Sequence, residues 1–561
     1  MAAEDQFAVL RNPTFVLGDK SLANTKGKML RRSDFPFENR FGVHFVDILS
    51  AWARGSRITK FKFPQRNLNI LGYFQHGDVF LAPVCRLDLI FLLILNRTKP
   101  SIMRPILIST GSRIGSTIVA FVIVFFFQTL AVSQTEDWPQ FLGPRQNGTA
   151  NDTNILRDWS GDQIETAWTL PVGEGYSIGS VAGGCYFHFD AETENGQSRL
   201  RCINLETGKL KWEHSDDCSY KDQYGYDSGP RSSPLIHDGL VYIFGVDGWL
   251  RCLDANDGSL TWEHDTGKKF GVLQNFFGVA SNPIIHDDSL LVMIGGSPAD
   301  NQDIPKGKLD LAKPNGSAIV AFDRKTGKVK YKTGDDLASY TSLRLVELHQ
   351  QPIALAWLRE SLIGFRPGDG EVLFKFRWRA RKLESVNAST PVVDGNKIFL
   401  SESYGPGGVQ LTVDAAADKE NKTAWSVKEV WSDKGRREKS IAAHWSTPVL
   451  HDGFLFGCSG QHGGSAEFRC VRWSDGKVMW AERGLGRTSA TLCGEHLIIL
   501  SERGRILLVK ASPESFQLVT EYKGDIKFRQ PCWAGPVVAQ GKLIVRGKNK
   551  VVCFPIGSEK P

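Results

Sequence analysis

The stretch from Ser232 to Trp262 reads SSPLIHDGLVYIFGVDGWLRCLDANDGSLTW and decides the fold. Three Asp-Gly pairs, at residues 238–239, 247–248 and 257–258, separate its apolar runs. Gly accepts the positive φ that tight hairpin turns need, and Asp hydrogen-bonds back to the turn backbone. Runs rich in Val, Ile, Leu and Phe between such turns are typical of buried strands. The stretch therefore predicts four short antiparallel strands joined by three turns.

The same pattern recurs along the C-terminal three quarters of the chain. Eight copies can be counted, and their main parts are Cys185–Trp212, Pro234–Trp262, Pro283–Tyr331, Pro352–Phe374, Pro391–Trp431, Pro448–Trp480, Leu497–Val509 and Pro536–Phe554. A period of roughly 40 to 55 residues with four strands per unit indicates propeller blades. We therefore predict an all-β fold over residues 161–556, an eight-bladed β-propeller of four-stranded antiparallel blades with almost no helix.

A tryptophan closes several units at one repeated place. These residues are Trp212, Trp262, Trp431 and Trp480. A side chain of this size on an outer strand can wedge between adjacent blades. Trp168 has the same outer-strand character but precedes the first blade, and the last unit, which ends near Phe554, lacks such a strand. We expect the strand around Trp168 to complete the last blade, which would remove a free sheet edge and close the ring.

These repeats resemble the pyrroloquinoline-quinone-type (PQQ-like) propeller, whose units end in Thr-Gly followed by Trp, as Thr207-Gly208 and Trp212 do here. The segment 137–144, DWPQFLGP, is similar to the mature start of secreted bacterial propellers of this type. The resemblance covers about residues 160–556. It implies the fold but no single activity. Quinoprotein dehydrogenases on this fold use an adjacent Cys-Cys disulfide, calcium and an Asp base, whereas a related lipoprotein propeller assists outer-membrane protein assembly.

The segment ahead of the propeller has the features of an export signal. Residues 103–133 combine basic Arg104 and Arg113 with the apolar run 118–127 and the small residues of Ala131-Val132-Ser133. We predict a signal peptide cleaved after Ser133, and the alternative is a retained anchor. No lipid anchor is expected, because Ser133 stands where a lipidated Cys would be required. Residues 134–160 then form an N-terminal leading segment.

Residues 1–102 show no repeat and no clear amphipathic period. We interpret them as an N-terminal extension that is unstructured or stems from a wrongly chosen start codon upstream of Met103; the alternative is a genuine cytoplasmic domain. They hold 15 basic and 8 acidic residues, whereas residues beyond 133 hold 51 basic and 53 acidic ones. The net charge of +7 therefore belongs to the first part of the chain. The near-neutral propeller gives no electrostatic basis for nucleic-acid binding.

The cysteines of the propeller do not form a disulfide framework. Cys202, Cys252, Cys470 and Cys553 share one repeat position. Such positions lie roughly 10 Å apart in neighbouring blades, beyond the roughly 7 Å between Cα atoms that a disulfide can bridge. We expect them to be small buried hydrophobic residues. The sequence has no Cys-x-x-Cys and no adjacent cysteines, which argues against zinc, redox-relay and haem sites.

The candidate site residues are those that precede the Ser-x-Pro motifs, since a side chain there is directed toward the central funnel. They are Arg231, Asn387, His444 and Arg487, with Gln530, Trp445, Tyr404 and His462 as further candidates. Each alone is more often a hydrogen-bonded structural residue than a ligand contact. The long interruptions 295–315, 413–423 and 433–442 are interpreted as loops from one face, where propellers bind.

These features predict an exported, periplasmic or extracellular, non-catalytic β-propeller that acts as a scaffold in the cell envelope. Its expected partner is a protein or a glycan on one propeller face. No catalytic residue, metal or cofactor is expected. The alternatives are a PQQ-dependent dehydrogenase that binds PQQ with calcium, and an outer-membrane protein assembly factor. The sequence leaves the oligomeric state, the ligand and the binding face open.

Overall fold

The computed structural model describes residues 136–557, apart from 152–153, 160–163, 274–275, 384 and 418–422, together with six short strands nearer the N-terminus. Two compact units are present, Met1–Val132 and Ser133–Pro561. In the first, the strands pair as β1 (Leu22–Ala23) with β2 (Met29–Leu30), β3 (Phe74–Gln75) with β4 (Asp78–Val79), and β5 (Leu89–Leu92) with β6 (Ile106–Ser109). The rest of the predicted extension and export signal lies outside the described residues.

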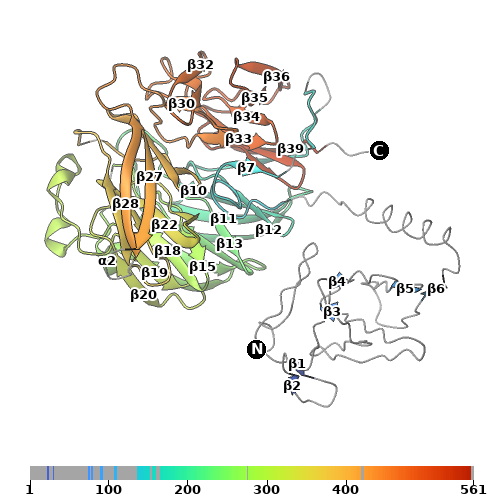
Figure 1. The fold of residues 1–561 in the computed structure, drawn as a ribbon, viewed down its shortest axis with the longest axis horizontal. Helices are drawn as coiled ribbons and strands as arrows, with labels where there is room; N and C mark the ends of the chain where they lie inside the picture. Colours follow the sequence, from blue (N-terminus) through green and yellow to red (C-terminus); the bar gives the residue numbers. More distant parts are fainter. Residues whose placement is uncertain are drawn as a thin grey trace. The chain divides into compact units, whose positions relative to one another are not determined.

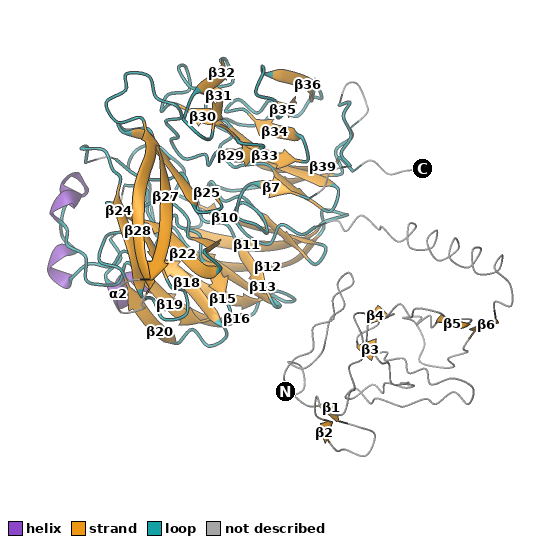
Figure 2. Cartoon of the chain, in the orientation of Figure 1, coloured by secondary structure: helices purple, strands orange, loops and turns teal. Residues whose placement is uncertain are grey.

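The second unit contains eight antiparallel sheets arranged around a common centre (Figures 1 and 2). Blade 1 contains β9 (Ser180–Ala182), β10 (Cys185–Glu192), β11 (Gln197–Asn204) and β12 (Leu210–Asp217). Blade 2 contains β13 (Leu235–His237), β14 (Leu240–Phe244), β15 (Trp249–Asp254) and β16 (Leu260–Asp265). Blade 3 contains β17 (Ile284–His286), β18 (Ser289–Met293), β19 (Ile319–Asp323) and β20 (Val329–Thr333). Blade 4 contains β21 (Arg344–Leu348), β22 (Gln351–Trp357), β23 (Ser361–Phe365) and β24 (Val372–Arg377).

The remaining blades follow the same order. Blade 5 contains β25 (Val392–Asp394), β26 (Lys397–Glu402), β27 (Gly407–Ala417) and β28 (Thr423–Ser432). Blade 6 contains β29 (Val449–His451), β30 (Phe454–Ser459), β31 (Glu467–Arg472) and β32 (Val478–Glu482). Blade 7 contains β33 (Ser489–Cys493), β34 (His496–Leu500), β35 (Ile506–Lys510) and β36 (Gln517–Glu521). Blade 8 contains β37 (Val537–Ala539), β38 (Lys542–Arg546), β39 (Lys550–Pro555) and β8 (Trp168–Pro171). The prediction of eight four-stranded blades is confirmed.

Helix is scarce in the described part of the chain, as predicted. It is confined to α2 (Thr266–Phe270) and to the short 3-10 helices η3 (Ala299–Asn301) and η4 (Lys306–Leu311), which lie in connections of blades 2 and 3. Among the described residues, no helix has the length and apolar character needed to span a membrane. The nine described cysteines are all free and buried, in agreement with their interpretation as core residues.

The ring closes through the strand that contains Trp168, as the sequence predicts. β8 pairs antiparallel with β39, and Trp168 lies opposite Cys553 in the register. The indole N–H of Trp168 donates to the carbonyl of Leu205 in blade 1 at 2.7 Å. Blade 8 is therefore built from both ends of the described propeller, and its outer strand also contacts the first blade.

Four blade-closing tryptophans, Trp168, Trp212, Trp262 and Trp431, pack against the turn glycine of the next blade, whereas the indole N–H of Trp480 donates to the carbonyl of Ser512. A Cβ atom added to Gly258 would lie 2.5 Å from the ring of Trp212, and the same conflict occurs between Gly327 and Trp262. The indole N–H of Trp212 donates to the Ala255 carbonyl at 3.1 Å. In the blades that have it, the glycine of the third turn is therefore required by contact with the neighbouring blade as well as by its positive φ.

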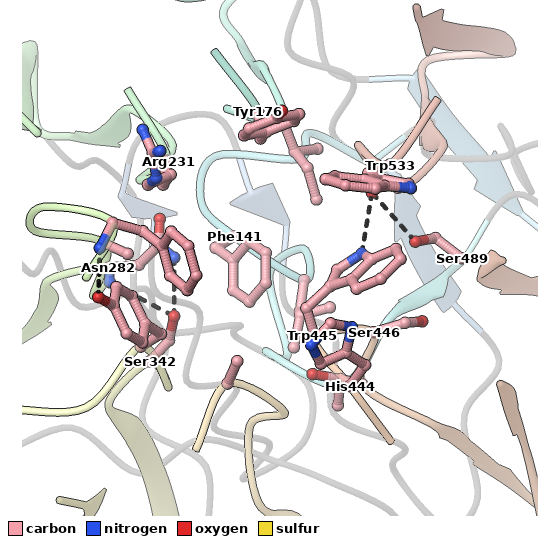
Figure 3. Close-up of a pocket in the computed structure, with 18 of the residues that line it drawn as sticks. Phe141, Tyr176, Arg231, Asn282, Ser342, His444, Trp445, Ser446, Ser489 and Trp533 are labelled. Carbon is pink, nitrogen blue, oxygen red and sulfur yellow. Dashed lines mark hydrogen bonds between the residues drawn. The ribbon is translucent and has the colours of Figure 1, made fainter. Parts of the chain in front are cut away.

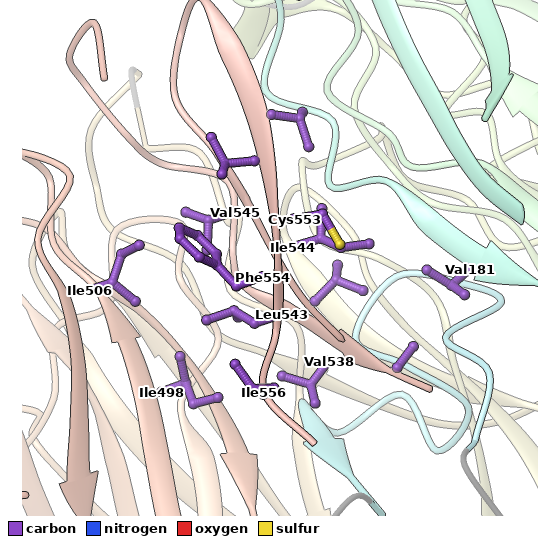
Figure 4. Close-up of a cluster of buried hydrophobic side chains, with 14 of the residues drawn as sticks. Val181, Ile498, Ile506, Val538, Leu543, Ile544, Val545, Cys553, Phe554 and Ile556 are labelled. Carbon is purple, nitrogen blue, oxygen red and sulfur yellow. The ribbon is translucent and has the colours of Figure 1, made fainter. Parts of the chain in front are cut away.

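The core consists of apolar layers between adjacent blades. One such cluster joins β34 and β35 to blade 8 through Ile498, Ile506, Leu543 and Phe554, all of them at most 2% exposed (Figure 4). Sheets that are buried on both faces need continuous apolar runs, which explains why the strands are rich in Val, Ile and Leu.

Hydrogen bonds also connect the inner strands of neighbouring blades around the channel. The N–H groups of Ile178, Ser233, Asn282, Ser342 and Thr390 donate to the side chains of Ser233, Asn282, Ser342, Thr390 and Thr447, respectively, at 2.5–3.3 Å. In four of the five blades that supply an acceptor, the accepting residue directly precedes a proline. The Ser-x-Pro motif therefore places a hydrogen-bond acceptor toward the preceding blade. Because the same bond recurs from blade to blade, it shows which residues of different blades occupy equivalent positions around the channel.

The two faces of the propeller carry different connections, because successive strands in a blade run in opposite directions. We call the face with the tight turns between the first two and last two strands the hairpin face, and the opposite one the linker face. Residues 295–315 and 433–442 lie in connections of the linker face. The third predicted loop, 413–423, instead lies at the end of the long hairpin β27–β28 on the hairpin face. The prediction that all three emerge from one face is wrong, since β27 and β28 extend through most of that stretch.

The leading segment runs along the hairpin face from blade to blade. Trp138 forms a bridge with Val181 in blade 1, Pro139 accepts the N–H of Ile236 in blade 2, and the Gln146 side chain accepts that of Leu345 in blade 4. Within this segment, β7 (Thr149–Ala150) adds to β33 as a parallel fifth strand of the blade 7 sheet. This path brings Phe141 and Leu142 into the lining of the central channel.

Candidate functional site: an aromatic cup in the channel

The central channel holds a cavity of about 230 Å³, which we call the cup. Its floor includes Trp138, Phe141 and Leu142 of the leading segment, and its walls come from the residues that precede the inner strands. Figure 3 shows Phe141 in the middle, between the side of Trp445 and Trp533 and that of Asn282 and Ser342. Because the leading segment lies across the hairpin face, the cup opens toward the linker face.

One repeat position supplies seven of the residues that line the cup. This position, which we call the ring position, lies two residues before the residue that accepts the hydrogen bond from the preceding blade, or before the equivalent residue in the other blades. In blades 1 to 8 the ring position is occupied by Tyr176, Arg231, Ala280, Tyr340, Ala388, Trp445, Arg487 and Trp533. All of these line the cup except Arg487, which lines a second cavity. The propeller symmetry therefore directs eight side chains toward the axis, and the composition of this ring determines what the channel can bind.

Aromatic rings form a continuous arc along the wall. The ring centroids are 4.8 Å apart for Trp445 and Trp533, 5.2 Å for Trp533 and Tyr176, and 5.7 Å for Trp533 and Tyr226. The ring centroid of Tyr226 is also 5.2 Å from that of Phe277, and the Phe277 centroid is 5.7 Å from that of Tyr340. Arrangements at these distances are attractive contacts between aromatic rings. The cup therefore has a mainly apolar wall made of preformed ring surfaces.

Two arginines lie over these rings. The Arg487 guanidinium is 4.5 Å from the centroid of Trp533 and 5.2 Å from that of Trp445, and Arg231 is 5.7 Å from that of Tyr176. Arg487 donates from Nε to Glu502 at 2.8 Å, and Arg231 donates to Asp222 at 3.2 Å. Both guanidinium groups are therefore held over the aromatic arc, at the distances of cation–π contacts.

His444 lies beside this arc and is neutral. Its Nε2 is 3.2 Å from the hydroxyl of Tyr404, and its ring contacts Trp445 at 5.3 Å. Burial, together with the nearby Arg487, lowers the pKa of His444 to about 4. At neutral pH the imidazole can therefore act as a hydrogen-bond donor or acceptor but contributes no charge.

Glu402, two residues before Tyr404, is a buried carboxyl group. It is 1% exposed, and one of its oxygens accepts the Tyr404 N–H at 2.7 Å. Burial raises the pKa of Glu402 to about 7. The carboxyl group therefore holds the Tyr404 backbone by a hydrogen bond and does not line the cup. Because its pKa lies near neutrality, the charge of this hydrogen-bond acceptor depends on pH.

A second, polar cavity of about 580 Å³ adjoins the cup, and we call it the vestibule. It shares Tyr176, Tyr226 and Trp533 with the cup. Its charged lining residues are Arg487, Glu502, Arg503 and Lys548. Tyr226, which is 37% exposed, stands at the boundary of the two cavities. A ligand on the linker face would meet polar groups before it reached the aromatic wall.

The four predicted site residues lie in different places. Arg231 lines the cup, and Arg487 lines the vestibule with its guanidinium on the cup tryptophans. His444 precedes the ring position of Trp445 by one residue and still lines the cup. Asn387 likewise precedes the ring position of Ala388, and its side chain donates instead to the carbonyls of Leu358 and Arg359 at 2.8 and 3.2 Å.

The other candidates divide in the same way. Trp445 and Tyr404 line the cup, Gln530 lines the vestibule, and His462 contributes backbone hydrogen bonds to the turn at residues 465–466. Sequence reasoning missed Tyr176, Tyr340 and Trp533, although they occupy the same ring position as Arg231. Their blades lack the Ser-x-Pro motif that defined the position, so only alignment on the inner strands could have found them.

The lining residues of the cup do not suit a calcium-bound quinone. Calcium is held by carboxylate and amide oxygens, and no Asp, Glu or Cys is found among the residues that line the cup. Within the described residues, no cluster of three or more His, Cys, Asp or Glu side chains has the arrangement of a metal site. The amide of Asn282 is already bonded to Ser233 and Ser342.

Comparison with known proteins places the propeller in a family. The family described as outer membrane protein assembly factor BamB matches residues 159–355 and 315–517, more than half of the chain. The chain belongs to this family. The expected PQQ-like propeller is thereby confirmed. No protein of curated function matches the chain.

Solved structures give fold likenesses at low identity. BamB from Moraxella catarrhalis is 12% identical, with a TM-score of 0.45, and the match covers 71% of this chain and 99% of that one. A quinohemoprotein alcohol dehydrogenase from Pseudomonas putida HK5 is 12% identical, with a TM-score of 0.49, over 76% and 81% of the two chains. Another, from Comamonas testosteroni, is 13% identical, with a TM-score of 0.41, over 78% and 83%. Scores of this size add nothing to the family assignment.

Proposed function

We propose that this member of the BamB family is an exported, non-catalytic binding protein whose ligand or partner segment enters the cup from the linker face. The observation that carries the proposal is the cup itself, a channel closed by Phe141 and Leu142 and walled by preformed aromatic rings. Concave apolar pockets with a few fixed polar groups are the usual form of binding sites. Export is supported by the signal-like segment 103–133 and by the envelope role named in the family's description.

The absence of carboxylate and thiol groups from the cup lining favours binding over quinone-dependent oxidation. Such an enzyme needs a metal ligand set and a base at the cofactor, and the cup supplies aromatic, hydroxyl, amide and guanidinium groups instead. His444 is a neutral imidazole without an acidic partner among the lining residues. The cup is therefore a recognition site in which no bond of the ligand is broken.

The test uses 1-anilinonaphthalene-8-sulfonate (ANS), an apolar anionic dye, with the protein beginning at Gln134. We expect saturable fluorescence enhancement that Trp533→Ala reduces strongly, because Trp533 lines both cavities. Trp425→Ala, on the long hairpin β28, is the matched control and should leave dye binding unchanged. Equal binding by both variants would contradict the proposal. If the protein, supplied with PQQ, calcium and an alcohol, reduces a redox dye that serves as electron acceptor, the dehydrogenase alternative is favoured.

A further inference from the structure

Several hydroxyl groups of the cup have a hydrogen left to donate. Tyr176 accepts the N–H of Asp227 at 3.2 Å, and Tyr340 accepts that of Phe277 at 2.7 Å. Ser342 and Thr447 accept backbone N–H groups of the neighbouring blades. Burial raises the pKa of both tyrosines far above its ordinary value, so that they stay protonated. The wall therefore combines aromatic faces with hydroxyl donors, and it suits a ligand rich in acceptor oxygens.

The wall is asymmetric around the axis. From blade 6 to blade 2 the ring position reads Trp445, Arg487, Trp533, Tyr176 and Arg231, which gives a continuous surface of tilted rings and guanidinium groups. Blades 3 and 5 place only Ala280 and Ala388 at the same position. Tyr340 of blade 4 stands between these two alanines, so space is left on either side of it. A ring-shaped ligand can therefore lie with one face on the arc and its edge toward Ser342 and Thr447.

A cationic ligand is disfavoured at this surface. The faces of Trp445, Trp533 and Tyr176 already carry Arg487 and Arg231. In the vestibule, Glu502 pairs with Arg487, and Asp227 pairs with Lys548. Arg503 is exposed and has no ion pair among the described side chains. One positive charge is therefore available for an anionic group in the vestibule.

We propose that the cup and vestibule bind the end of an acidic oligosaccharide, with one sugar ring against the aromatic arc and a carboxylate of the next sugar at Arg503. A sugar ring has an apolar C–H face that packs on aromatic rings, and acceptor oxygens at its edge. The closed floor of the cup admits a chain end and no threaded chain. This inference rests on the proposed binding function and names the chemistry of its ligand.

The experiment measures displacement of ANS by two trisaccharides, trigalacturonic acid and maltotriose. We expect trigalacturonic acid to displace the dye at lower concentration, by a factor of roughly ten, because only the acidic sugar can place a carboxylate at Arg503. Raising the salt concentration should reduce this difference, since Arg503 is exposed. Tryptophan fluorescence should change together with dye release, because Trp445 and Trp533 form the wall.

Two variants and one control separate the contribution of the charge from that of the hydroxyl donors. Arg503→Gln should abolish the preference for the acidic sugar and leave maltotriose displacement unchanged, whereas Lys328→Gln, an exposed charge at a turn of the hairpin face, should change neither. Tyr176→Phe, which removes one hydroxyl donor of the wall, should weaken both sugars several-fold. If neither sugar displaces ANS at millimolar concentration, the saccharide inference is wrong, while dye binding itself still supports the proposed function. Absence of dye binding would overturn the proposed function instead.

Discussion

At the residue scale, a turn glycine of one blade packs against the closing tryptophan of the preceding blade. Gly258 and Gly239 both have positive φ, of 76° and 75°, but they differ in what surrounds them. A Cβ atom on Gly258 would meet the ring of Trp212 at 2.5 Å, whereas one on Gly239 would have no heavy atom within 4 Å. Two turns that look alike in the sequence therefore have different reasons for glycine, and only one of them is a blade contact.

This difference gives the first prediction. Gly258→Ala should lower the free energy of unfolding by about 2–4 kcal/mol, from strain at positive φ plus displacement of Trp212. Gly239→Ala should cost about 1 kcal/mol, since only the backbone term remains. Urea denaturation followed by circular dichroism measures both. Equal losses in the two variants would show that the contact with Trp212 contributes nothing.

Glu402 gives a pH-dependent prediction. Its folded pKa of about 7 lies above its ordinary value of 4.5, so the folded state binds more protons than the unfolded state between these values. The contribution of this group to stability is therefore fully present below pH 4.5 and is lost as the pH rises through 7. Glu402→Gln should be more stable than the wild type at pH 8, by an amount on the order of 3 kcal/mol, and similar to it at pH 5.

Thermal unfolding of both proteins from pH 5 to pH 8 measures the difference. His444 titrates in the opposite sense, because its lowered pKa costs stability as the pH falls below 6.5. It is present in both proteins, so its effect cancels in the comparison. A stability difference that does not change with pH would contradict the assignment of Glu402.

At the element scale, β8 is the strand that holds the ring together. It pairs with β39, and Trp168 contacts blade 1 through the carbonyl of Leu205. Trp168→Ala should cost about 3–5 kcal/mol, because it removes a large buried side chain. Trp425→Ala, on the outer strand β28, should cost clearly less, since Trp425 is only half-buried. Chemical denaturation tests the pair, and a smaller loss for Trp168 than for Trp425 would contradict the role of β8.

The leading segment is the second element with a role of its own, because it closes one end of the channel. Without Phe141 and Leu142 the channel would lack its floor, although the eight blades themselves do not depend on these side chains for their pairing. The sequence marked the segment as similar to the start of secreted propellers, but nothing in it revealed that the segment runs across the hairpin face. That course depends on contacts with blades 1, 2, 4 and 7, which are far apart in the sequence.

At the scale of the whole molecule, the chain consists of the propeller and the part before it. We predict that the exported protein begins at Gln134 and that a chain made from Gln134 onward unfolds at the same temperature as the full chain. The reason is that the sequence places an export signal at 103–133 and every repeat after it. N-terminal sequencing of the processed protein checks the first part and calorimetry the second. A mature protein that retains residues before Met103 would contradict both.

The sequence by itself determined the blade count, the antiparallel order, the tryptophan contacts and the closure through Trp168. All of these follow from local turn chemistry and from a repeat that imposes the same geometry eight times. The repeat also located the funnel, and Arg231 and His444 were found there. Tertiary structure alone decided that the channel is closed, that Asn387 turns to backbone carbonyls, and that Tyr176, Tyr340 and Trp533 complete the wall. These depend on contacts between distant blades, which no local pattern in the chain records.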